Sequence, residues 1–235
     1  MGRVLPILFN TEMVQAILDG RKNVTRRAVK YRYSNTEMKI RADKYGNRLI
    51  EIQKDIEGET HGKNPDGGTW HKLLPYIEKN PPYKKGDILY VREAYCPNYF
   101  SRSIAGCRGD GLRGNRNAYK ADYHKEIIGD TVPEPKWRPS IHMPKQAARI
   151  WLRVTDVRVE RLQDITQEGI LADGVINQQS NPSMGKRWVN MQKLEFEKIW
   201  NATIKKTDLD TYGWNANPWV WVIGFERCNK PESEG

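Results

Sequence analysis

The chain is poor in cysteine and histidine, and this limits the disulfide and metal chemistry that it can support. Its three cysteines, Cys96, Cys107 and Cys228, are odd in number and far apart. They form no Cys-x-x-Cys pair, which argues against a disulfide framework and against a structural zinc site. The four histidines lack the close spacing of a metal-binding helix. The sequence therefore predicts neither a metal nor a cofactor.

Long apolar runs are also missing. Hydrophobic residues make up 38% of the chain and the mean hydropathy is -0.78, which favours long polar loops. No segment approaches the roughly 18 apolar residues that a membrane-spanning helix needs, and residues 1–9 are too short for a secretion signal. We expect a cytoplasmic protein with no membrane partner. Its 235 residues are enough for one well-buried domain with elaborations.

Positive charge, by contrast, is abundant and unevenly placed. The net charge is +10, and residues 1–50 hold 11 Lys and Arg against 4 Asp and Glu. Residues 101–150 hold 10 against 5, so the rest of the chain is close to neutral. Clustered positive charge is expected for a phosphate-bearing partner such as RNA. Charge that only keeps the protein soluble is the alternative.

The most informative stretch is Gly-Arg-Lys-Asn-Val-Thr-Arg-Arg, residues 20–27. It follows an amphipathic segment, residues 11–19, that predicts a helix capped by Asn10 or Thr11 and ended by Gly20. A helix C-terminus attracts cations through its dipole, which explains Arg21 and Lys22. It does not explain Thr25, Arg26 and Arg27, so these residues are candidates for function.

The pattern helix, then Gly-x-Lys-x-x-x-x-Arg, resembles the signature of the ASCH domain, a member of the PUA-like superfamily of small β-barrels. Residues 86–93 resemble the turn and strand that follow this signature in the family, and residues 137–144 and 214–223 resemble segments of the larger bacteriophage and prophage ASCH proteins. The resemblance implies an α+β fold, a PUA-like/ASCH β-barrel with short flanking helices and inserted loops. We expect a single domain over residues 1–228, with inserts at about 33–82 and 98–136, and a frayed tail at 229–235.

The residue patterns predict the elements of this fold. Strands are expected at residues 4–9, 88–93, 118–121, 148–161 and 218–225, and a hairpin within residues 38–52. The apolar alternation of residues 148–161 shifts phase at Thr155-Asp156, which is typical of a β-bulge. Helices are expected from Asp164 or Thr166 to Gly174, and over residues 188–201. Residues 55–82 and the Gly/Arg-rich residues 101–117 are expected to form loops. The second loop could lie along the phosphate backbone of a nucleic acid, or it could be an ordinary surface loop.

One ASCH branch hydrolyses the acetyl amide of acetylcytidine with a Lys, a Thr and an acidic residue. Lys22, Thr25 and Arg27 fall on the motif of that branch, and Asp173 falls on the acidic position, where the branch has Glu. A threonine hydroxyl needs a base to become a nucleophile. Lys22 can be that base only if its pKa drops from about 10.4 towards 7–8. Arg26 and Arg27 would lower this pKa, and a nearby acid would raise it.

Other residues are candidates for binding a substrate or a nucleic acid. Besides Arg21, Arg26 and Arg27, they include Arg92 and Glu93 at the end of the expected strand. A stiff loop between two prolines carries Trp137, Arg138, Ser140 and His142, and it could stack and hydrogen-bond a base or serve as a rigid connector. Ser140 and His142 point the same way if this loop is extended. Trp214 and Asn215 precede the last strand.

These observations favour a protein that binds RNA or a modified nucleoside in a basic cleft. Three alternatives remain open: an enzyme that hydrolyses an acylated nucleobase or cleaves RNA, a non-catalytic reader of nucleic acid, and a phage effector that binds a host protein. In the last case the host cytoplasm is the expected location. A concave pocket containing Lys22 and Thr25 favours the enzyme, and a flat basic surface favours the reader. The sequence leaves the oligomeric state open.

Overall fold

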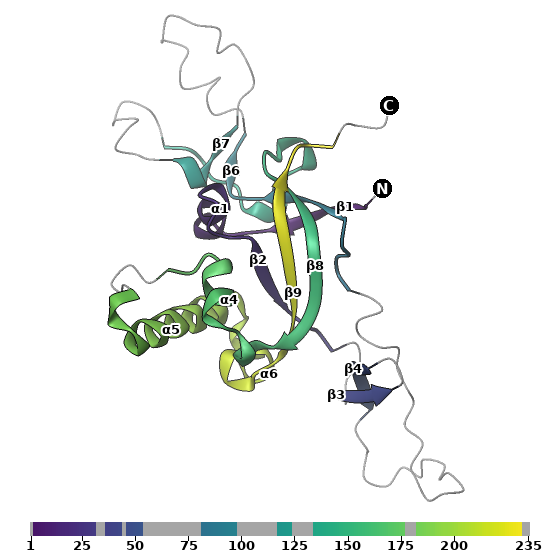
Figure 1. The fold of residues 1–235 in the computed structure, drawn as a ribbon. Helices are drawn as coiled ribbons and strands as arrows, with labels where there is room; N and C mark the ends of the chain where they lie inside the picture. The colour runs from purple at the N-terminus through teal and green to yellow at the C-terminus, as the bar shows by residue number, and fades with distance from the viewer. Residues whose placement is uncertain are drawn as a thin grey trace, which may run out of the picture.

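A computed structural model describes residues 2–31, 36–43, 46–53, 81–97, 117–123, 134–176 and 182–231. Its centre is a five-stranded sheet in the order β1-β5-β8-β9-β2 (Figure 1). β1 and β5 are parallel, and the other neighbours are antiparallel. The strand bounds are Val4–Leu8 for β1, Val24–Ala28 for β2, Ile88–Arg92 for β5, Trp151–Arg161 for β8 and Trp219–Cys228 for β9.

The sheet and its flanking helices confirm the α+β class. No pairing among the described strands joins β1 to β2, so the sheet is open between these two edges. The PUA-like barrel therefore stays a prediction.

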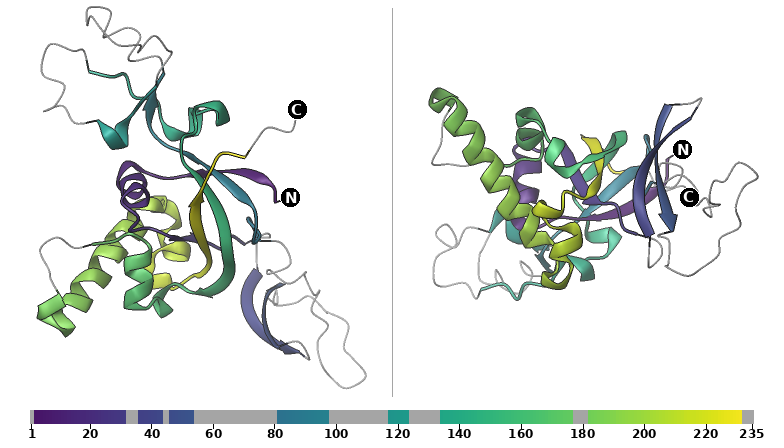
Figure 2. Two further views of the ribbon diagram at one scale, coloured as in Figure 1. Left: turned by 45° about the horizontal axis from the view of Figure 1, so that its top comes forward. Right: turned by 90° about the horizontal axis from the view of Figure 1, so that it is seen from below.

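The longest strand, β8, carries the irregularity that its sequence predicts. Its register against β9 shifts between Val154 and Asp156, so that Thr155 is the extra residue. Gly224 lies opposite this bulge, and a Cβ there would come within 3.1 Å of Thr155 Oγ1. Bulges increase the local twist of a strand, and β8 and β9 curve together in the left view of Figure 2.

The two faces of the sheet pack against different partners. On one face, Leu89, Leu152 and Ile223 are fully buried together with residues of α1 (Thr11–Leu18). On the other face, Val220 and Val222 pack against α4 (Gln167–Ala172) and α5 (Lys186–Thr203). Alternate residues of β9 thus face opposite sides of the sheet. Fully burying one such side chain contributes about 1.5–3 kcal/mol.

The helix ends follow the expected chemistry. The Asn10 side chain accepts a hydrogen bond from Met13 N at 2.9 Å and caps α1, and Gly20 follows this helix at φ +75°. Thr166 caps α4 in the same way through Gly169 N, at 3.1 Å. Helix α5 extends two residues beyond its predicted range at each end. The short helix α6 (Leu209–Tyr212) was not expected, and Figure 1 shows it grouped with α4 and α5.

Two small ribbons complete the described fold. β3 (Thr36–Asp43) and β4 (Gly46–Gln53) form the predicted hairpin, a separate two-stranded sheet whose Met38 and Leu49 belong to the same buried cluster as residues of the main sheet. β6 (Tyr95–Cys96) pairs with β7 (Ala118–Tyr119). The strand predicted at residues 118–121 is only two residues long, because the chain then turns into a 3-10 helix at Lys120–Asp122.

Several predicted segments lie outside the described residues. These are nearly all of the loops at 55–82 and 101–117, and the last four residues of the tail. Among the described helices, none has the length and apolar character required to cross a membrane.

A tight turn before β5 is organised by the buried carboxylate of Asp87. This carboxylate accepts hydrogen bonds from Arg3 N at 3.0 Å, from Lys84 N at 2.8 Å and from the Arg3 guanidinium. Burial alone would raise the pKa of Asp87, but these hydrogen bonds outweigh it and hold the pKa below its usual value. The charged form of Asp87 therefore stabilises the fold.

We expect Asp87→Asn to lower the free energy of unfolding at pH 7 by about 1–3 kcal/mol, the usual effect of losing hydrogen bonds to a charged group. The stabilisation by Asp87 is complete above its unfolded pKa of about 3.9 and is lost as the pH falls through the folded pKa. The gap between wild type and variant should therefore shrink below about pH 4, measured by urea unfolding at several pH values. The exposed Asp156→Asn serves as control. A gap that stays constant down to pH 2 would contradict this account.

Candidate functional site

The turn between α1 and β2 sets the direction of the basic motif. After Gly20, the backbone amides of Arg21 and Lys22 both donate to Ala16 O, at 2.9 and 3.0 Å. This closure folds the chain back against α1 and brings Lys22 beside the end of α4. Asn23 N then donates to Ala172 O at 3.0 Å, and Lys22 forms an isolated β-bridge with Asp173.

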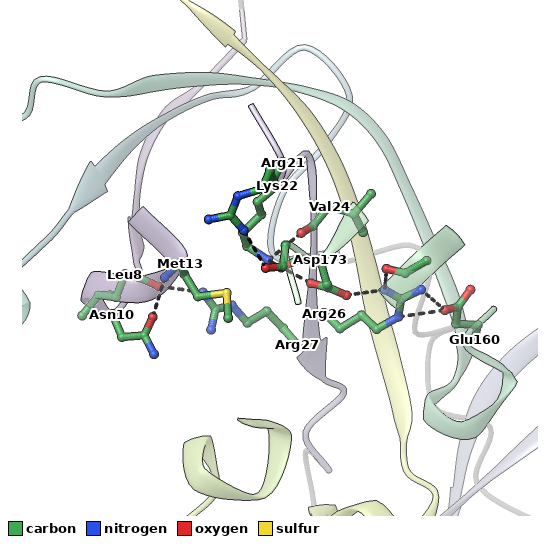
Figure 3. Close-up of polar contacts among 12 residues, drawn as sticks. Leu8, Asn10, Met13, Arg21, Lys22, Val24, Arg26, Arg27, Glu160 and Asp173 are labelled. Carbon is green, nitrogen blue, oxygen red and sulfur yellow. Dashed lines mark hydrogen bonds and ion pairs between the residues drawn. The ribbon is translucent and has the colours of Figure 1, made fainter. Parts of the chain in front are cut away.

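Lys22 is buried, with 4% of its surface exposed. Its ammonium donates to Val24 O at 2.7 Å, to Asp173 O at 2.8 Å and to Asp173 Oδ1 at 2.9 Å (Figure 3). A lysine ammonium has three donors, so all of them are engaged. Lys22 and Asp173, two predicted catalytic residues 151 positions apart, are in direct contact.

The second oxygen of Asp173 extends this contact into a network. It accepts a short hydrogen bond from Arg26 Nη1, and Arg26 also donates to Glu160 Oε1 from Nε at 3.0 Å and from Nη2 at 2.8 Å. Two cations and two carboxylates thus alternate from α4 across β2 to β8 (Figure 3). Buried charges are tolerated when they are paired and hydrogen-bonded in this way.

Burial lowers the pKa of Lys22, and the positive charges of Arg27 and Arg26 add to this effect. The carboxylate of Asp173 acts in the opposite direction but does not cancel the shift. The two opposing electrostatic effects expected from the sequence are therefore both present, and burial, which the sequence did not reveal, is the largest cause.

An open cavity of about 120 Å³ lies beside this network. Its polar side contains Thr25 and Arg27, which project from the same face of β2, as well as Lys22 and Asp173. Its apolar side comes from the end of β1, from α1 and from α5. The apolar lining residues are Leu8, Phe9, Met13, Val175, Phe196, Ile199 and Trp200. The predicted catalytic residues therefore share a concave site.

Arg27 is the third cation in the lining of this cavity, besides Lys22 and Arg26. Its Nη2 donates to Leu8 O at 2.7 Å, and its guanidinium lies 5.4 Å from the centre of the Phe9 ring. No salt bridge to Arg27 occurs among the residues that the structure describes. Burial lowers its pKa, yet a guanidinium stays charged at neutral pH. Arg27 can thus donate hydrogen bonds to a ligand.

Thr25 is 4% exposed and lines the same cavity. Within the described part of the chain, no hydrogen bond joins Thr25 Oγ1 to Lys22 Nζ. Lys22 would have to release one of its acceptors before it could take a proton from this hydroxyl. Such contacts often tighten only when a substrate binds.

The remaining candidate residues fall outside the lining of this cavity. Arg21 is exposed beside it and bonds to Asp19 Oδ2 and Gly174 O. Glu93 is buried and receives two hydrogen bonds from Arg149, at 2.9 and 3.0 Å. Arg92 donates to Ile141 O.

The loop at residues 137–144 is not extended. Ser140–His142 form a single 3-10 turn, in which His142 N donates to Pro139 O. The premise that Ser140 and His142 point the same way along an extended segment is therefore wrong. Trp137 packs edge-on against Tyr123, and Arg138 is bound to Tyr95 through its backbone.

The two candidates before the last strand also lie elsewhere. Trp214 is buried in the core and packs edge-on against Phe196, at 6.0 Å between ring centroids. Asn215 is exposed next to it.

Sequence reasoning missed several residues of the site. Glu160 lies on β8 among other charged residues, and nothing in its local pattern distinguishes it from a solvated side chain. The Lys22 ammonium and the Arg27 guanidinium lie over the Phe9 ring, at 5.6 and 5.4 Å from its centre. Phe196 and Trp200 belong to the apolar stripe of α5, which by itself predicts only core packing.

Close packing around Lys22 depends on Gly174, which has φ +81°. A Cβ at this position would lie 2.8 Å from Ala16 Cβ and 2.9 Å from Lys22 Cβ. We expect Gly174→Ala to destabilise the protein by about 2–5 kcal/mol, the sum of a left-handed backbone penalty and overpacking.

Gly20→Ala is the matched control, because Gly20 has φ +75° but open space around its Cβ position. Gly20→Ala should lower the free energy of unfolding only by the left-handed backbone penalty, about 1–2 kcal/mol. If chemical denaturation shows the same loss of stability for Gly174→Ala and Gly20→Ala, the packing between α1, α4 and Lys22 is loose.

Comparison with known proteins finds no matching family model, no matching curated protein and no matching solved structure. Among the described residues, no group of three or more His, Cys, Asp or Glu side chains could hold a metal ion. The geometry of the cavity and the residue pattern of the motif therefore carry the functional proposal.

Proposed function

We propose that this chain is an ASCH-type protein with a PUA-like fold that binds a modified pyrimidine nucleoside, free or within RNA, and hydrolyses its acyl amide. One observation carries this proposal: Lys22, Thr25, Arg27 and Asp173 line one cavity. They are the positions at which the motif resemblance places the active residues of the acetylcytidine-hydrolysing branch.

The lining of the cavity fits a planar base. Phe196 and Trp200 stack on each other with an interplanar angle of 19° and form part of an apolar wall. Unpaired bases commonly stack on aromatic side chains. Arg27 and Thr25 supply hydrogen-bond donors in the same lining. The open mouth leaves room for a ribose to remain outside.

The proposed reaction is acyl transfer through Thr25. Its Oγ1 attacks the carbonyl carbon of the acyl amide, and a neutral Lys22 takes the hydroxyl proton. Arg27 donates to the developing oxyanion. Lys22 then returns the proton to the departing amine nitrogen of the base, and the acyl–Thr25 ester remains. Water hydrolyses this ester with Lys22 again as base, releasing the carboxylic acid.

The lowered pKa of Lys22 supports this role, because a general base must be neutral part of the time. Arg26, held by Glu160, would keep Asp173 in position to orient Lys22 throughout.

A non-catalytic reader of the same modified base is the second candidate. The observation in its favour is that all three donors of Lys22 are engaged. This arrangement suits a protonated lysine that shapes the pocket and takes no part in proton transfer.

Incubating the protein with acetylcytidine and other N-acylated pyrimidine nucleosides, with products separated by chromatography, tests the proposal. We expect cytidine and acetate from acetylcytidine. Calorimetric binding of acetylcytidine without turnover would favour the reader. Neither binding nor turnover of any acylated nucleoside would overturn the proposed function.

A further inference from the structure

A second and larger cavity, of about 320 Å³, opens on the face of the sheet that packs with α1. It lies between the turn that precedes β5 and the bulge of β8. Trp221, Val157 and Tyr83 belong to its lining. No residue of this cavity belongs to the catalytic proposal.

The two cavities are neighbours. Trp221 of the second cavity is the cross-strand partner of Arg27 of the first. Directly paired residues of an antiparallel pair project from the same face of the sheet, with Cβ atoms about 5 Å apart. Burial lowers the pKa of Arg27 and raises that of Tyr83, and each group partly offsets the shift of the other, so the two are also close. Arg27 therefore stands at the boundary between the cavities.

The rim of the second cavity is positively charged. Among the described lining residues, Lys84, Lys85 and Arg158 stand against one carboxylate, Asp156, which gives a net charge of +2. Asp156 is already engaged by Arg158, at 2.9 Å. Lys84 and Lys85 are exposed, and no salt bridge to either occurs in the described part of the chain. The two ammonium groups beside Tyr83 and Trp221 suit a ligand with an aromatic ring and a phosphate, that is, a nucleotide.

Hydrogen bonds within the chain hold the residues around this cavity in place. Its lysine rim is held by the Asp87 carboxylate, which accepts from Lys84 N at 2.8 Å. The same turn is tied to β8 through Gly86 N to Val154 O at 2.8 Å and Val154 N to Asp87 O at 2.9 Å. The Tyr83 hydroxyl donates to Pro6 O at 2.9 Å, which fixes the ring. A preorganised site of this kind loses little entropy on binding.

We infer that the second cavity binds a nucleotide that flanks the modified one, so that the substrate is a single-stranded polynucleotide rather than a free nucleoside. The inference rests on the proposed function of the first cavity. Arg27 lies where the linking phosphate would pass from one cavity to the other. Stacking on Tyr83 and Trp221 and charge contacts from Lys84 and Lys85 would hold the flanking nucleotide.

The test compares free acetylcytidine with a seven-nucleotide RNA that carries acetylcytidine at its centre, and with the DNA strand of the same sequence. Affinities are measured by calorimetry or fluorescence anisotropy at several salt concentrations. We expect the RNA to bind at least about tenfold tighter than the free nucleoside, consistent with about 1–3 kcal/mol for one stacked base. The DNA arm shows whether a ribose is required.

The informative variant is the double substitution Lys84→Gln and Lys85→Gln, which leaves the backbone bond to Asp87 in place. It should weaken oligonucleotide binding and reduce the logarithmic salt slope by about 1.4, the value for two phosphate contacts on a single strand. Affinity for the free nucleoside, and its turnover, should not change. The control, Lys186→Gln with Arg187→Gln, removes the same charge at the exposed start of α5. It should leave both affinities nearly unchanged.

The outcomes separate the two proposals. If the free nucleoside binds but the oligonucleotides bind no tighter, or if the Lys84/Lys85 variant behaves like its control, the flanking site is overturned and the proposed function stands. If the wild type binds neither nucleoside nor oligonucleotide, both proposals fail.

Discussion

Asp173→Ala is expected to reduce the free energy of unfolding by about 3–5 kcal/mol, because it leaves two buried cations without their shared carboxylate. Lys22 would lose its ion pair with Asp173, and of the two described ion pairs of Arg26 the one with Glu160 would remain. Marginally stable domains have only about 5–15 kcal/mol in total, so the variant should unfold at a clearly lower denaturant concentration. Equilibrium urea or guanidinium unfolding measures this loss.

Two further variants identify the source of that effect. Asp173→Asn keeps the shape and part of the hydrogen bonding, and its loss should be smaller. Asp164→Ala removes an exposed carboxylate close to the same helix and should stay within about 0.5 kcal/mol of wild type. A loss below about 1 kcal/mol for Asp173→Ala would mean that the network is not an important part of the fold.

The second large effect is expected on catalysis. Thr25→Val replaces the proposed nucleophile with a side chain of the same shape and high β propensity, so the fold of β2 should be kept. Turnover of acetylcytidine should fall on the order of 10³-fold or more, because no attacking hydroxyl remains. Thr25→Ser should retain measurable activity. Steady-state rates measured by chromatography, with unfolding curves of each variant, separate chemistry from stability.

Lys22→Met should reduce turnover to a similar degree, and it keeps most of the side-chain volume. Because Lys22 and Thr25 act as one unit in the proposed reaction, the double variant should be no slower than the slower single variant. Turnover within about threefold of wild type for Thr25→Val would rule out the nucleophile; additive losses would indicate that the two residues act separately.

Local signals in the sequence were sufficient for most of the regular elements. The cap at Asn10, the stop at Gly20 and the phase shift at Thr155 each depend on neighbouring residues alone. Lys22, Thr25 and Arg27 lie within one six-residue motif, so their shared location needed no knowledge of the tertiary structure.

The parts that sequence reasoning missed depend on contacts between distant segments. Glu160 meets Arg26 only because β8 and β2 both pair with β9. The wall formed by Phe196 and Trp200 depends on how closely α5 approaches β2, and an apolar stripe indicates which side of a helix is buried but not what it faces. In the loop before β8, the 3-10 turn at Ser140–His142 replaces the extended path on which the orientation of the two side chains was based.

The central claim, that the cavity beside Lys22 holds an acylated pyrimidine, is tested most directly by a crystal structure of the Thr25→Val variant with acetylcytidine. The account predicts the pyrimidine ring against Phe196 and Trp200, and the acyl carbonyl carbon within about 3.5 Å of the residue 25 side chain, a distance suited to attack. An acyl group turned away from residue 25, or a ligand bound at another place on the protein, would contradict the account.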